Sequence, residues 1–87
     1  MSPIVTFATV HQALKCENVL GTDGVGVRLM PVPRRLSSSC GLCAEIAGLD
    51  ATALCARLEA AGIEYEAVYR MGDKGPPELV ASMDDNQ

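Results

Sequence analysis

Six stretches of this chain alternate between strand-like and helix-like patterns, and their order permits few folds. Four are short runs of apolar or alternating residues, typical of β-strands, at residues 4–8, 25–32, 41–47 and 63–70. Two have apolar residues at helical spacing, at residues 10–20 and 51–62. The order β-α-β-β-α-β predicts an α+β fold, the ferredoxin-like plait, with a four-stranded antiparallel sheet and two helices on one face.

Residues that cap helices precede both predicted helices. Thr9 and Gln12 form a capping box, in which each side chain satisfies a backbone N–H group of the first turn. Asp50 can cap the second helix through its carboxylate. Residues 71–87 are rich in Pro, Gly and Asp, so we expect one domain over residues 1–70 and a mobile acidic tail after it.

Length and charge exclude several classes of protein. A chain of 87 residues is long enough for one core but not for two domains. Its formal net charge of -4 argues against a nucleic-acid partner, because phosphate binding needs a basic face. The sequence shows no membrane-spanning run and no signal peptide, so we expect a cytoplasmic protein that does not bind membranes. In that reducing compartment its four cysteines are free thiols, metal ligands or redox groups rather than a disulfide framework.

Strand parity assigns side chains to the two faces of the predicted sheet, because alternate residues point to opposite sides. One parity of the second and third strands is apolar and is expected to face the helices. These residues are Val25, Val27, Leu29, Leu42, Ala44 and Ile46. Arg28, Cys43 and Glu45 have the other parity and should lie on the side without helices.

The four cysteines fall into two kinds of surroundings. Cys16 and Cys55 lie beside apolar helical stripes, where free cysteine behaves as a small buried hydrophobe. Cys40 instead ends the run PVPRRLSSSC, which concentrates positive charge and hydroxyl groups. Cys43 completes a CxxC pattern, but in an extended strand the two Cα atoms would be roughly 10 Å apart, beyond the roughly 7 Å limit for a disulfide. We therefore expect no disulfide between them.

The topology predicts the surroundings of Cys40. The first and third strands of the plait are neighbours, so Cys40 should lie near the first turn of the first helix. Free N–H groups and the helix dipole favour an anion there, and a thiolate is such an anion. Cys40 is the predicted reactive atom. The candidates for a supporting role are Thr9, His11, Arg34, Arg35, Ser39, Gly41 and Cys43.

The runs TFATVHQALKCENVL and RLMPVPRRLSSSCGL resemble a family of small bacterial proteins described as selenium or sulfur carriers, over residues 4–69. The resemblance implies that Cys40 accepts sulfur or selenium as a persulfide or perselenide, with Arg34 and Ser39 as its companions. It implies a carrier rather than a catalyst, without a cofactor. Its partner would be a donor protein such as a cysteine desulfurase or a sulfurtransferase. Cys43 departs from the family pattern, which leaves a resolving, metal-binding or filling role open.

Two other functions remain open from the residues themselves. The chain could be a regulatory or protein-interaction domain that uses the exposed sheet face and performs no thiol chemistry. It could also be a small metal-binding module that uses Cys40 and Cys43. Zinc would then need further ligands, and His11 is the single histidine of the chain.

Overall fold

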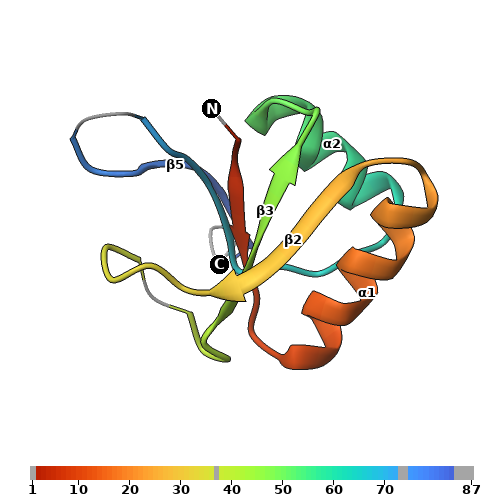
Figure 1. Cartoon of the computed structure of the whole chain (residues 1–87), viewed down its shortest axis with the longest axis horizontal. Coiled ribbons are helices and arrows are strands. Elements are labelled where there is room, and N and C mark those ends of the chain that lie inside the picture. Colours follow the sequence, from red (N-terminus) through yellow and green to blue (C-terminus); the bar gives the residue numbers. More distant parts are fainter. Residues whose placement is uncertain (1, 37, 73–74, 84–87) are drawn as a thin grey trace.

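A computed structural model describes residues 2–36, 38–72 and 75–83. In this part of the chain, two helices and five strands form one α+β unit (Figure 1). In chain order, the elements are β1 (Ile4–Thr6), α1 (Val10–Thr22), β2 (Gly26–Pro31), β3 (Leu42–Ala47), α2 (Ala51–Ala60), β4 (Ala67–Arg70) and β5 (Glu78–Ser82).

The sheet has the strand order β2-β3-β1-β4-β5, and neighbouring strands are antiparallel. Its first four strands follow the order of the predicted plait, which confirms the α+β class. The prediction of four strands is wrong, because residues 78–82 of the expected tail form β5 beside β4. The short run ELVAS contains three consecutive apolar residues, 79–81, and pairs with β4 although the residues before it are typical of loops. The rest of the expected tail includes residues 73–74 and 84–87, which lie outside the described residues.

The predicted fourth strand is shorter than its alternating pattern suggested. Only residues 67–70 of the stretch 63–70 belong to β4. Ile63 and Tyr65 are buried all the same, because they pack into the main core from the segment that links α2 to β4. The alternation of apolar and polar residues over 63–66 therefore reflects burial of every second side chain. Residues 63–66 do not belong to a strand.

Both predicted helix caps are present. Thr9 Oγ1 accepts a hydrogen bond from the N–H of Gln12 at 3.2 Å, and Asp50 Oδ1 accepts one from the N–H of Ala53 at 2.7 Å. Gln12 Oε1 accepts from the N–H of Ala8 at 3.0 Å, one residue before the N–H expected for a standard capping box. The bonds of Thr9 and Gln12 fix the point at which the chain leaves β1 and enters α1.

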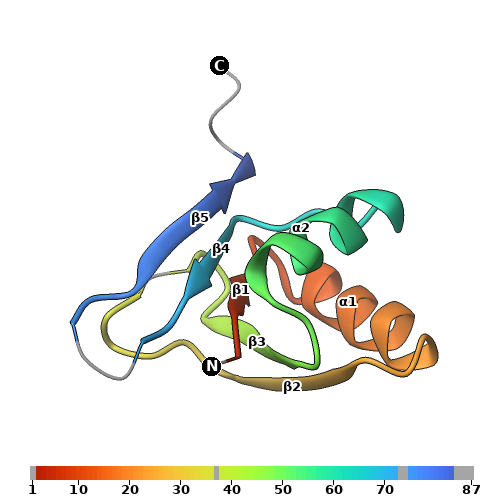
Figure 2. The same cartoon turned by 90° about the horizontal axis from the view of Figure 1, so that it is seen from above.

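The main core lies between the sheet and the helices, which cover the same face (Figure 2). α1 packs on β2 and β3, whereas α2 packs on β4 and β5. Ala44 and Ile46 are fully buried in this core, and the other residues assigned to this face by parity pack against it. On the opposite face, which we call the open face, Arg28 and Glu45 form an ion pair at 3.4 Å. The face assignment is therefore confirmed.

Candidate functional site

Cys40 lies in the turn by which the chain enters β3. Gly41 has a φ of +80°, a left-handed conformation that residues with a side chain rarely adopt. Its carbonyl oxygen accepts a hydrogen bond from the N–H of Val32 at 3.1 Å. This bond closes the base of the loop between β2 and β3, so that Cys40 is held beside the first residue of the strand.

Ser38 joins this loop to the end of β1. Its hydroxyl donates to the carbonyl oxygen of Phe7 at 2.8 Å, which places the loop next to the turn between β1 and α1, as both views show (Figures 1 and 2). Ser38 Oγ also lies 3.9 Å from Cys40 Sγ, and Cys40 Sγ lies 3.7 Å from the carbonyl oxygen of Leu42. A hydroxyl that donates to Phe7 can still accept from the thiol, so Ser38 is a direct neighbour of the sulfur atom.

The first turn of α1, next to this loop, is capped by Thr9. The N–H groups of Gln12 and Ala13 donate to the side chain and the carbonyl oxygen of Thr9. Thr9 therefore caps the helix, and its hydroxyl is engaged in that cap. These two N–H groups are engaged within the helix and its cap, and the influence of the first turn on the Cys40 thiolate stays a prediction.

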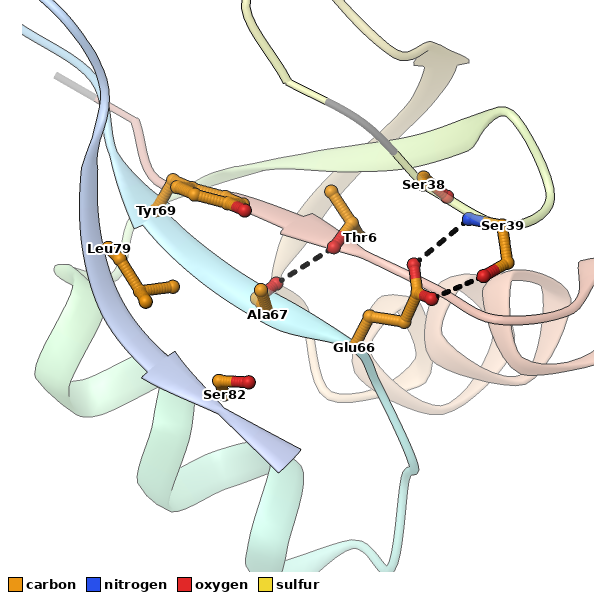
Figure 3. Close-up of a pocket in the computed structure, with 8 residues that line it drawn as sticks. All are labelled: Thr6, Ser38, Ser39, Glu66, Ala67, Tyr69, Leu79 and Ser82. Atoms are coloured by element: carbon orange, nitrogen blue, oxygen red, sulfur yellow. Dashed lines mark hydrogen bonds between the residues drawn. The ribbon is translucent and has the colours of Figure 1, made fainter. Parts of the chain in front are cut away.

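A polar cleft of about 430 Å³ opens beside the loop, on the open face of the sheet. Its lining residues are Thr6, Ser38, Ser39, Glu66, Ala67, Tyr69, Leu79 and Ser82. Figure 3 shows Ser39 and Glu66 pointing toward each other across one end of this cleft. Ser39 donates its N–H to Glu66 Oε1 at 3.1 Å and its hydroxyl to Glu66 Oε2 at 2.5 Å. One wall of the cleft is thus the backbone that leads directly into Cys40.

Arg35 and His11, two candidate members of the site, lie against other parts of the molecule. Arg35 Nη1 donates to the carbonyl oxygen of Gly75 at 2.8 Å and so ties the loop to the connection between β4 and β5. Arg34 is exposed on the same loop. His11 is exposed and lines a separate hollow of about 170 Å³ with Lys15 and residues that follow α2. The Arg35 guanidinium thus binds the β4–β5 connection and His11 lines a separate hollow, while Ser39 and Gly41 flank Cys40 in the chain.

All four cysteines are free thiols, which confirms the absence of a disulfide between Cys40 and Cys43. Cys16 is fully buried, as predicted, and burial raises its pKa to about 11. Cys55 is half-buried, and burial followed by the nearby Glu59 carboxylate raises the pKa of its thiol. Cys40 is also half-buried, but it lies in a loop rather than on a helix.

Cys43 differs from Cys40 although only two residues separate them. Its thiol is fully buried on the open face of β3, where it donates to the carbonyl oxygen of Pro31 at 3.8 Å. Burial raises its pKa to about 11, with smaller contributions from Glu45 and Cys40. A buried thiol that holds its proton is a poor nucleophile and a poor metal ligand. These surroundings favour a filling role for Cys43 over a resolving or metal-binding one.

Residues 2–36, 38–72 and 75–83 hold no group of three or more His, Cys, Asp or Glu side chains placed to bind a metal ion. Neither helix in this part of the chain is long and apolar enough to cross a membrane.

Two features of the site could not be predicted from the sequence. They are the contact of Ser38 with Cys40 and the bonds of Glu66 to Ser39. Ser38 was recognised only as one of three loop serines, because nothing in the run SSS indicates which hydroxyl reaches Phe7. Glu66 follows the alternation of the run IEYEAVYR and resembled an ordinary exposed strand residue. Its link to Ser39 depends on a contact between residues far apart in the sequence, for which a single sequence holds no signal.

Comparisons with known proteins give one match. The model of the family described as "Putative Se/S carrier protein-like" matches residues 2–70, which include Cys40 and end at the last residue of β4. No curated protein and no solved structure shows significant similarity to the chain.

Proposed function

The chain belongs to the Se/S carrier-like family, and from this premise we propose that it carries sulfur or selenium on Cys40. The family match covers both helices and four of the five described strands. It therefore includes the loop that presents Cys40 and the segment of β1 that anchors the loop.

The difference in environment among the four thiols carries this assignment. Cys16 and Cys43 are fully buried with pKa values raised to about 11. Burial also raises the pKa of Cys55, which lies on α2. Cys40 combines partial exposure with a position in a loop closed by Ser38 and Gly41. Because the thiolate is the nucleophile and must reach its partner, Cys40 is the best-placed acceptor of the four.

The transfer is an exchange at sulfur that needs no net oxidant. The Cys40 thiolate attacks the outer sulfur of a donor persulfide, and a bond forms between Cys40 Sγ and that sulfur. The sulfur–sulfur bond of the donor breaks, and the donor leaves as a thiolate. A nucleophile of the acceptor later attacks the same outer atom, and Cys40 leaves as the thiolate. Selenium would follow the same sequence of bond changes.

Several features of the site suit this exchange. Ser38 Oγ and the carbonyl oxygen of Leu42 lie within 4 Å of Cys40 Sγ and can accept the proton of the resting thiol. Ser38 could instead donate to the sulfur when it is an anion, at the expense of its bond to Phe7. The partner in this proposal is a protein that bears a persulfide, such as a cysteine desulfurase or a sulfurtransferase. The proposed compartment is the cytoplasm, where reducing conditions keep the thiols free.

Intact-mass measurement tests the proposal. The reduced protein is incubated with a low-molecular-weight persulfide and, separately, with a cysteine desulfurase and cysteine. We expect the mass to rise by one sulfur atom, and we expect thiol reductant to reverse the change. Peptide mapping should place the added atom on Cys40.

Two variants make this test specific. Cys40→Ser should gain no sulfur, whereas Cys55→Ser, which removes the other half-buried thiol, should gain it as the unchanged protein does. Equal uptake by Cys40→Ser would contradict the proposal. No uptake by the unchanged protein would favour the interaction-domain interpretation instead.

A further inference from the structure

We infer that Glu66 is a positioning residue for Cys40, acting through Ser39. Glu66 lies outside the run PVPRRLSSSCG and contacts Ser39 rather than the sulfur atom. The inference rests on the proposed function, because the step that Glu66 supports is the delivery of sulfur to Cys40.

The contact between Glu66 and Ser39 is a double hydrogen bond to a charged group. The two carboxylate oxygens of Glu66 accept separately from the N–H of Ser39, at 3.1 Å, and from its hydroxyl, at 2.5 Å (Figure 3). Bonds to an ionised acceptor are about twice as strong as neutral ones, and a pair of them also fixes orientation. Glu66 thus restrains both the backbone and the side chain of the residue that precedes Cys40.

The backbone of Glu66 is itself fixed to the sheet. Its N–H donates to the carbonyl oxygen of Thr6 at 2.7 Å, and its carbonyl oxygen accepts from the N–H of Met83 at 3.1 Å. These bonds continue the pairing of β4 with β1 and β5 by one residue. The carboxylate therefore projects from a rigid position, unlike that of a typical surface glutamate.

Three attachments then hold the segment 38–41, and they differ in origin. Ser38 binds Phe7, and Gly41 binds Val32, both through bonds to backbone atoms next to the loop. The third attachment differs from these two, because Ser39 binds the carboxylate of Glu66, the residue that precedes β4. Removing this carboxylate would free Ser39 on the side that faces the cleft, while the base of the loop stays closed.

The test compares Glu66→Gln and Glu66→Ala with Glu64→Gln as the matched control. Glu64 is exposed two residues away and accepts from Gln12 Nε2, so its replacement removes the same charge without touching the loop. Hydrogen exchange of the Ser39 amide should become at least about tenfold faster in Glu66→Ala, the change expected when a bond to a charged group is lost. Glu66→Gln keeps one acceptor and should lie between Glu66→Ala and the unchanged protein. The control should match the unchanged protein.

The second readout is the rate at which Cys40 takes up sulfur from a low-molecular-weight persulfide. We expect Glu66→Ala to be slower by at least about fivefold and Ser39→Ala to be slower as well. The double variant should be no slower than Glu66→Ala, because Ser39→Ala removes only the hydroxyl bond, which is one of the two bonds that Glu66→Ala removes. Additive effects would overturn the inference. An unchanged rate in Glu66→Ala, with the far-ultraviolet circular dichroism of the unchanged protein, would overturn it too.

The two readouts separate this inference from the proposed function. If the unchanged protein takes up no sulfur, the proposed function fails, and the rate of Cys40 alkylation replaces sulfur uptake in the comparison of variants. Ser39 exchange still decides whether Glu66 holds the loop, since exchange requires no sulfur chemistry. Unaltered Ser39 exchange in both Glu66 variants would overturn the inference even if sulfur uptake occurs.

Discussion

The two faces of the sheet are stabilised by different forces. On the helix side, large apolar residues such as Phe7, Leu54 and Leu58 are fully buried in one core. Beside the open face, the segment that leads into Cys40 is held by hydrogen bonds from Ser38, Ser39 and Val32, and the Cys40 side chain packs against the margin of the core. The first side is stabilised by burial of area, and the second by directional bonds that set the position of one residue.

This difference separates the stability of the chain from its proposed chemistry. A packed core resists local change, because its residues share many neighbours. A loop held by individual bonds can be altered one bond at a time with little effect on the fold. Substitutions on the helix side should therefore change the free energy of unfolding, whereas substitutions around Ser39 should change the behaviour of Cys40.

A pair of leucine substitutions should show the largest contrast in stability between the two faces. Leu54 is a fully buried residue of α2, whereas Leu79 lines the cleft and is 54% exposed. Leu54→Ala should lower the free energy of unfolding by about 2–5 kcal/mol, through lost burial and the cavity left behind. Leu79→Ala should change it by less than about 1 kcal/mol. Urea denaturation of both variants measures the difference. Equal losses of unfolding free energy would contradict the contrast between the two faces.

Alkaline pH should also lower the free energy of unfolding, through one buried thiol on each face. Burial raises the pKa of Cys16 and Cys43 from 9.0 to about 11 in the folded chain. The unfolded chain loses these protons first, so the stabilisation is complete below pH 9 and is lost as the pH rises toward 11. At about 1.4 kcal/mol per pH unit, the loss is on the order of 3 kcal/mol for each thiol.

The measurement for this prediction is urea denaturation at several pH values across that window. Cys16→Ala and Cys43→Ala should each show a shallower decrease in stability with pH than the unchanged protein. Equal slopes in all three proteins would mean that neither thiol holds its proton more tightly in the folded state.

Periodicity and caps were sufficient to predict most of the fold. Thr9 and Asp50 indicated where the helices begin, and strand parity assigned Ala44 and Ile46 to the core. β5 was missed because the apolar run at 78–82 is short and follows Gly75 and two prolines. Such a strand forms because β4 offers a free edge, a condition set by the rest of the fold rather than by local sequence.

The candidate site could be predicted only in part. The run SSSCG indicated the loop, and the topology predicted that it lies near the start of α1. The bond from Ser38 to Phe7 shows this proximity. The role given to Arg35 depended on its nearness in sequence, and its guanidinium instead binds the carbonyl oxygen of Gly75. Glu66 could not be foreseen, because its bond to Ser39 spans 27 residues and depends on how the loop crosses the open face.

Competitive alkylation of the native, reduced protein tests the central claim, that Cys40 is the reactive thiol. With limiting iodoacetamide near neutral pH, peptide mapping should find label on Cys40 first, then on half-buried Cys55. Cys16 and Cys43 should react last, because both are fully buried with raised pKa values. Labelling of Cys55, Cys43 or Cys16 before Cys40, or at the same rate, would contradict the assignment of Cys40 as the reactive thiol.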